Sequence, residues 1–328
     1  MISDKHIVVI GGGTGSFTVL NALKEYSHSL TAIVNMTDDG GSTGTLRDEL
    51  GVLPPGDVRQ CLVALSDSPK IRDLFNYRFS EGTFDGHSFG NIFLTKLKKM
   101  TGNFAEAVET ASEVLNVNGR VLPATLDNVR LKMSWDDKSI TLHGEHVIDA
   151  DLFVHDPRTA RLHLEPTATA NPAALEAIRT ADLVVIAPGD LYTSLGPLLV
   201  IDGFGDALKQ TAAKVVYVCN LVTKKGQTEG FSVVDHAAEI ERFAGKDCLD
   251  YVLHNREKPT ADLVRRYEEE EAYVVEPGQT LNEQHYQAIA DNLLGQTAEA
   301  VEGDALAALR SFIRHDGARL AKRIVELA

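Results

Sequence analysis

Three aspartates are the residues best suited to chemistry in this chain. Asp38 and Asp39 are adjacent in the stretch MTDDGGSTG, and Asp57 ends a Pro-Pro-Gly-Asp turn. Carboxylates near a phosphorylated ligand are suited to Mg²⁺, which typically takes one or two of them together with the phosphates. One of these carboxylates could also act as the base for a hydroxyl nucleophile. A structural interpretation stays open beside this one: Asp39 could cap the turn that follows it, and Asp57 could cap a helix beginning at Val58.

A glycine-rich segment provides a second candidate site. It comprises Gly11, Gly12, Gly13, Thr14 and Gly15. The apolar run 7–10 precedes it and apolar residues at helical spacing follow over 17–23, so the pattern predicts a buried strand, a tight turn and a helix. Free amides at a helix start favour an anion such as phosphate. If the ligand meets the backbone here, Gly13→Val should abolish nucleotide binding and leave the fold largely intact; the alternative is that the glycines serve only close packing.

The glycine segment is an imperfect dinucleotide fingerprint. The pattern G-x-G-x-x-G would require glycine where the chain has Ser16. A dinucleotide enzyme would also place an acid at the end of the second strand, expected over Leu30–Val34, and that end carries Asn35. No lysine follows the glycines, which excludes a Walker loop. The residues therefore disfavour a NAD-dependent dehydrogenase.

Alternating strand and helix patterns are expected to position these residues. Buried strands are predicted over 183–187, 215–219 and 251–253, each ending in a polar loop. Because the carboxyl ends of parallel strands meet at one edge, a ligand crevice is expected there. Beyond the glycine segment, its candidate residues are His87, Asn91, Gly189, Tyr192, Ser194 and Asn220.

The fold class predicted is α/β, a Rossmann-like doubly wound and mainly parallel sheet. Residues 119–165 change texture to short alternating runs, which predicts a small antiparallel β insertion in a single domain spanning 1–328. Residues 36–66 are expected to form a long functional loop, with helical spacing from 59 to 65. Further helices are predicted over 71–79, 104–115 and 305–327. For Lys224 and Lys225 two interpretations stay open, namely phosphate contacts or solvated side chains.

Composition narrows the function classes. The chain has 328 residues and a formal net charge of −15, which argues against non-specific binding to nucleic acid or anionic membranes. Its three cysteines form no C-x-x-C pair, and no run of eighteen apolar residues occurs, so we expect a cytoplasmic protein without membrane insertion.

Several long segments together resemble the gluconeogenesis factor family, which is similar to 2-phospho-L-lactate transferase. The matching segments are GGGTGSFTVL (11–20), the stretch 36–66, GHSFGN (86–91), LPATLDNV (122–129), PGDLYTS (188–194) and CNLVTKKGQTEGFS (219–232). Two departures occur: residues 187–190 read APGD where the family usually has GPGS, and 194–197 read SLGP where SIIPN is common.

The resemblance implies a cytosolic regulatory factor that binds a UDP-sugar, UDP-N-acetylglucosamine. It links such a factor to gluconeogenic growth, central carbon metabolism and cell-shape or envelope synthesis, and it implicates Tyr267 and Arg314 in the binding. In the transferase branch, the positions of Asp38, Asp39 and Asp57 lie at a metal and phosphate site. The alternative is thus a Mg²⁺-dependent transferase acting on a nucleoside-diphosphate-linked donor. The expected partner is the nucleotide-sugar, with a homodimer left open.

Overall fold

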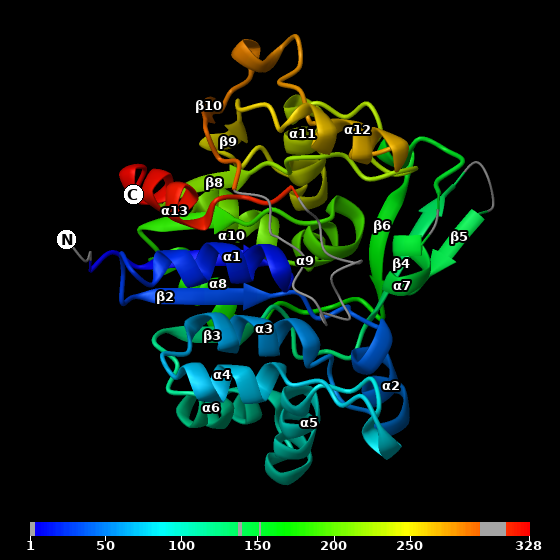
Figure 1. The fold of residues 1–328 in the computed structure, drawn as a ribbon, viewed down its shortest axis with the longest axis vertical. Coiled ribbons are helices and arrows are strands. Elements are labelled where there is room, and N and C mark those ends of the chain that lie inside the picture. The colour runs from blue at the N-terminus through cyan, green and yellow to red at the C-terminus, as the bar shows by residue number, and fades with distance from the viewer. Residues whose placement is uncertain (1–3, 137–139, 151, 296–312) are drawn as a thin grey trace.

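A seven-stranded sheet forms the centre of the molecule. The computed structural model describes residues 4–136, 140–150, 152–295 and 313–328 (Figure 1). The strand order is β10-β9-β8-β7-β1-β2-β3, and every neighbouring pair is parallel. In that order, the strands span Gln287–Asp291, Tyr251–Asn255, Lys214–Val218, Leu183–Ile186, Ile7–Gly11, Leu30–Val34 and Arg120–Pro123.

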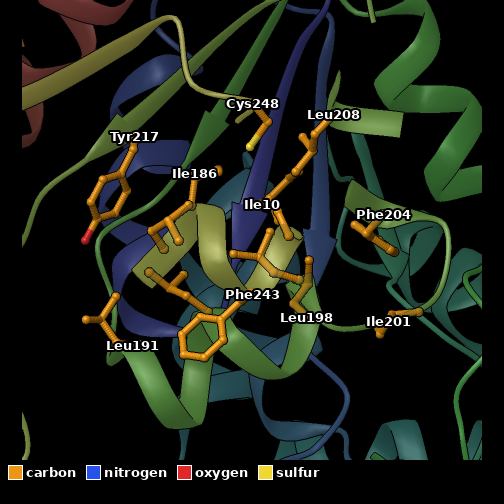
Figure 2. Close-up of a cluster of buried hydrophobic side chains, with 14 of the residues drawn as sticks. Ile10, Ile186, Leu191, Leu198, Ile201, Phe204, Leu208, Tyr217, Phe243 and Cys248 are labelled. Atoms are coloured by element: carbon orange, nitrogen blue, oxygen red, sulfur yellow. The ribbon is translucent and has the colours of Figure 1, made fainter. Parts of the chain in front are cut away.

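The central strands are buried on both faces, as continuous apolar runs in a parallel sheet require. In β1, Val8 and Ile10 face one core, while Ile7 and Val9 face the other. Figure 2 shows part of the first core, where Ile10 and Ile186 lie among side chains from the covering helices, including Phe243. The doubly wound α/β fold predicted from the sequence is confirmed.

Helices cover the two faces. The helices with side chains in the core of Ile7 and Val9 are α1 (Thr14–Leu23), α3 (Gly56–Leu65), α4 (Pro69–Asn76), α5 (Phe89–Thr101), α6 (Phe104–Val114) and α13 (Gly317–Glu326). Those in the core of Val8 and Ile10 include α8 (Pro172–Thr180), α9 (Gly196–Leu199), α10 (Phe204–Gln210) and α11 (Val233–Ala244). Two further helices are α2 (Gly41–Leu50) and α12 (Ala261–Glu269).

The predicted β insertion is present as a separate sheet. It is antiparallel, with the order β5-β4-β6, and its strands span Ile140–His143, Arg130–Trp135 and Arg161–Glu165. A short helix, α7 (Glu145–Ala150), follows β5. In Figure 1 the insertion lies beyond the end of the main sheet toward which the β2 arrow points.

Four boundaries differ from the sequence expectation. Residues 120–123, expected in the insertion, form β3 and pair with β2 in the main sheet. The segment expected as a loop over 36–66 contains α2, because Leu46 and the buried Arg47 anchor it despite its glycines. The helix expected over 71–79 ends at Asn76. Of the helix expected over 305–327, residues 305–312 lie outside the described part, and α13 accounts for 317–326.

In the described ranges, no helix is both long and apolar enough to cross a membrane.

Candidate functional site

The strand order reverses between β1 and β7. From β1 the chain continues outward to β2 and β3, whereas β8, β9 and β10 lie on the β7 side. Such a switch point opens a crevice at the carboxyl ends of the strands, where ligands bind in open α/β sheets. A Cβ added to Gly12 would lie 3.1 Å from Oδ2 of Asp57 and 3.2 Å from Oγ of Ser194. The glycine segment, the start of α3 and the turn after β7 therefore meet at this edge.

Close packing explains the glycines of the segment more directly than ligand approach does. A Cβ on Gly13 would lie 2.5 Å from Oδ1 of Asp57, and one on Gly15 would lie 1.7 Å from the carbonyl oxygen of Pro188. A Cβ on Gly11 would lie 2.7 Å from Oγ of Ser16. Gly13→Val would therefore require the side chains of Asp57 and Gln60 on α3 to move, and whether the fold is kept stays a prediction. No side chain in the described ranges caps α1, although the Gly13 amide just before it donates to the Asp57 carboxylate, so the amides of its first turn stay suited to an anion.

Asp38 and Asp57 lie close to each other. Asp38 accepts a hydrogen bond from the Gly40 amide at 3.0 Å, and a Cβ on Gly56 would lie 2.9 Å from its Oδ2. Burial, followed by the negative charge of Asp38, raises the pKa of Asp57 to about 7. Burial also raises the pKa of Asp38. This pair can hold a proton near neutral pH, which suits a general base or a hydrogen-bond partner for a ligand.

Asp39 faces away from that pair. Its carboxylate accepts hydrogen bonds from the backbone amides of Glu145 at 3.2 Å and His146 at 2.8 Å, and Arg130 lies 3.2 Å away. It thus caps α7 rather than the turn that follows it in sequence. The three aspartates do not converge, and no three acidic, histidine or cysteine side chains in the described ranges are placed to hold a metal ion. Mg²⁺ binding by Asp38 and Asp57 with a ligand's phosphates stays a prediction.

The carboxyl group that lies near Asp38 and Asp57, where Asp39 was expected, belongs to Glu145. Its Oε2 accepts a hydrogen bond from the Thr37 hydroxyl at 2.8 Å, and Nδ2 of Asn35 lies 3.5 Å away. Burial, then the charges of Asp38 and Asp57, raise its pKa well above the usual value. Sequence reasoning missed this residue because it lies in the insertion, 110 positions beyond Asn35. No local pattern around it resembles a site.

His87 and Asn91 form a structural network beside α2. Nδ1 of His87 lies 2.9 Å from the Ser42 hydroxyl, to which Asn91 donates at 3.3 Å. The buried Asn91 also accepts a hydrogen bond from Nε of Arg59 at 3.0 Å. Burial lowers the pKa of Arg59 to about 10. These contacts tie α5 to α2 and α3, and only the half-exposed His87 has a surface to offer a ligand.

The candidate residues in and beside the turn after β7 have different surroundings. Tyr192 is fully buried and donates its hydroxyl hydrogen to Oε2 of Glu239 at 2.9 Å, so its side chain lies in the core and not in the crevice. Ser194 lies beside Gly12, at the edge where the crevice is expected. Asn220 bonds both backbone groups of Gly189, at 3.1 and 2.9 Å.

Tyr267 lies beside the segment that contains Arg314. The hydroxyl of Tyr267 accepts a hydrogen bond from the Ile313 amide at 3.0 Å, and the side chains of Tyr267 and Ile313 pack with Leu221. Nε2 of His315 donates to the carbonyl of Cys219 at 3.2 Å. The structure thus brings these distant parts of the chain to the end of β8, next to Asn220.

The two lysines of the loop after β8 form ion pairs, and a phosphate contact by either of them stays a prediction. Lys224 pairs with Asp149 and, at 2.9 Å, with Asp190. Lys225 pairs with Glu271 at 3.0 Å.

Comparison with known proteins identifies the family. A sequence model of the family described as 2-phospho-L-lactate transferase CofD matches residues 7–294. The chain belongs to this CofD family. It is 39% identical over 327 residues to a putative gluconeogenesis factor of Thermotoga maritima, covering 98% of this chain and 99% of that protein. It is 36% identical to the gluconeogenesis factor of Bacillus subtilis, covering 98% and 97%.

A solved structure that is 36% identical to this chain has the same fold. The crystal structure of a UPF0052 family member from Bacillus halodurans superimposes with a TM-score of 0.87 at 36% identity, covering 99% of this chain and 100% of that one. The resemblance found in the sequence is therefore confirmed at the level of family and fold.

Proposed function

We propose that this protein is a gluconeogenesis factor that binds a UDP-sugar, UDP-N-acetylglucosamine, and acts by binding rather than by turnover. The observation that carries the proposal is the meeting of the uncapped start of α1 with the Ser194 turn at the reversal of the sheet. Helix-start amides suit a diphosphate, and a switch-point crevice is where α/β proteins place nucleotides. The relatives' printed name supports the link to gluconeogenic growth. Roles in central carbon metabolism and in cell-shape or envelope synthesis are part of the proposal.

Several features favour a UDP-sugar over NAD. Asn35, at the end of β2, is buried and bonded to Thr37 at 3.0 Å, and it is not the acid that a dinucleotide fingerprint places on that strand. Tyr267 and residues 313–315 lie next to the end of β8, at the same edge as the Gly189 turn, which keeps Arg314 near the proposed site.

A thermal-shift titration tests the proposal. UDP-N-acetylglucosamine at about 100 times its dissociation constant should raise the free energy of unfolding by about 2.7 kcal/mol. NAD at the same concentration should leave the melting temperature unchanged. A shift with NAD alone would show that the proposed ligand is wrong.

The second candidate is a transferase that uses a nucleoside-diphosphate-linked donor. It is favoured by Asp57, whose pKa of about 7 suits a general base at neutral pH. In that case Asp57→Asn should lower turnover at least about 10²-fold while the nucleotide still binds. Release of free nucleotide from the donor, measured with and without Mg²⁺, decides between the two candidates.

A further inference from the structure

The β insertion delivers one acidic side chain to the edge of the main sheet. Oε2 of Glu145 lies 2.8 Å from the Thr37 hydroxyl and 3.5 Å from Nδ2 of Asn35. The Asn35 amide group also donates to the Thr193 carbonyl at 3.3 Å, and its backbone amide donates to Gly11 at 3.0 Å. Glu145 is thereby joined to the ends of β1 and β2 and to the turn after β7, the segments that border the crevice.

Backbone amides and carboxyl groups lie together at this edge. The start of α1 presents backbone amides that favour a phosphate, and Asp57 lies beside it, with Oδ1 2.5 Å from the position of a Cβ on Gly13. Beyond the effect of burial, the charge of Asp38 raises the pKa of Asp57, and the charges of Asp38 and Asp57 raise the pKa of Glu145. Carboxyl oxygens accept hydrogen bonds from hydroxyl groups well, each carboxylate offering about four lone-pair positions. The carboxyl of Glu145 therefore suits a hydroxyl-rich part of a ligand.

Contacts at both ends hold α7 in place. At its start, Asp39 accepts from the Glu145 and His146 amides, and a Cβ on Gly144 would lie 2.7 Å from the Asp39 carboxylate. At its other end, Nε2 of Gln227 donates to the Ile148 carbonyl at 2.9 Å. The hydroxyl of Thr193 donates to Asp149 at 3.3 Å. The direction of the Glu145 side chain thus depends on the cap that Asp39 provides.

We propose that Glu145 is a sugar-recognising residue of the nucleotide-sugar site, its carboxyl hydrogen-bonding hydroxyls of the ligand, and that Asp39 positions it. This inference rests on the proposed function and adds which residue recognises the sugar. It also assigns Asp39 a positioning role in place of a metal or catalytic one.

The test compares two ligands by isothermal titration calorimetry. UDP carries the diphosphate without the added sugar, and UDP-N-acetylglucosamine carries both, so the ratio of their dissociation constants measures sugar recognition. Glu145→Ala should weaken UDP-N-acetylglucosamine binding about tenfold or more, as loss of charge-assisted hydrogen bonds does, with UDP affinity changed less than about twofold. The control is Glu165→Ala, which removes an exposed glutamate of β6 in the same insertion and should leave both constants unchanged.

Asp39 variants test the positioning role and stand in if Glu145→Ala fails to fold. Asp39→Ala, like Glu145→Ala, should reduce the ratio of the dissociation constant of UDP to that of UDP-N-acetylglucosamine. It should also speed amide hydrogen exchange in α7. Asp39→Asn, which keeps one oxygen for the amides, should restore part of the ratio. An unchanged ratio in Glu145→Ala, or an equal loss of both ligands, overturns the inference while the proposed function stands. Failure of the wild type to bind UDP-N-acetylglucosamine overturns both.

Discussion

The side-chain amide of Asn220 bonds both backbone groups of Gly189. Its Nδ2 donates to the Gly189 carbonyl at 2.9 Å, and its Oδ1 accepts from the Gly189 amide at 3.1 Å. This pair joins the segment after β8 to the turn after β7, because Gly189 follows the end of β7 at Ile186 and Asn220 follows the end of β8 at Val218. The turn that ends at Ser194 is thus fixed from the neighbouring strand.

Removing that pair should weaken both ligand binding and stability. Asn220→Ala leaves two backbone groups of Gly189 without their partner, which should cost about 1–3 kcal/mol of unfolding free energy. The loosened turn should reduce affinity for UDP-N-acetylglucosamine about tenfold, measured by calorimetry. Asn118→Ala, which removes only a part-exposed bond to His28, serves as the control and should change neither quantity. Full affinity in Asn220→Ala would show that the turn does not contact the ligand.

The packing role of the glycine segment predicts a reversal of the usual helix effect. Alanine normally stabilises a helix by about 1 kcal/mol relative to glycine. Gly15→Ala should instead destabilise by at least about 2 kcal/mol, since its Cβ would lie 1.7 Å from the Pro188 carbonyl oxygen. Gly40→Ala, whose Cβ would meet its nearest neighbour at 3.6 Å, should cost less than about 1 kcal/mol. Urea unfolding of both variants measures this, and equal costs would contradict the packing explanation.

The sequence predicted the outline of this region but not all its roles. The apolar run 7–10 before the glycines predicted β1, its turn and α1, and the parallel pairing of β1 with β2 followed from the alternating pattern. Tyr192 was expected at the ligand because it follows a strand in a polar turn. The pattern could not show that its ring turns into the core toward Glu239, since that partner lies 47 residues further along.

Long-range contacts explain what remained unpredicted. Adjacent aspartates indicate one shared site, yet Asp38 and Asp39 point apart because Asp39 meets α7, 106 residues away along the chain. Glu145 was missed for the same reason: its place at the edge of the sheet depends on how the insertion folds back, which no local spacing shows.

The pKa of Asp57 predicts a pH-dependent effect on stability. It rises from 3.8 to about 7 on folding, so the folded chain binds more protons here than the unfolded one between those values. The contribution of Asp57 to the free energy of unfolding therefore falls as pH rises from about 4 to about 7, by up to about 1.4 kcal/mol per unit.

Asp57→Asn removes that penalty. It should raise the free energy of unfolding relative to wild type by more than about 1 kcal/mol at pH 8, with a smaller gain at pH 4. Asp262→Asn, an exposed aspartate of α12, should show no such difference between the two pH values. Urea unfolding at both values provides the comparison. A gain that is the same at pH 4 and pH 8 would show that Asp57 titrates normally.

The most direct test of the account is to titrate the wild-type protein with UDP-N-acetylglucosamine and Mg²⁺ in a calorimeter and then recover the ligand for chromatography. We predict saturable binding of one ligand per chain, with the nucleotide-sugar recovered intact after prolonged incubation. Absence of binding, or accumulation of free UDP that depends on the protein, would contradict a factor that acts by binding alone.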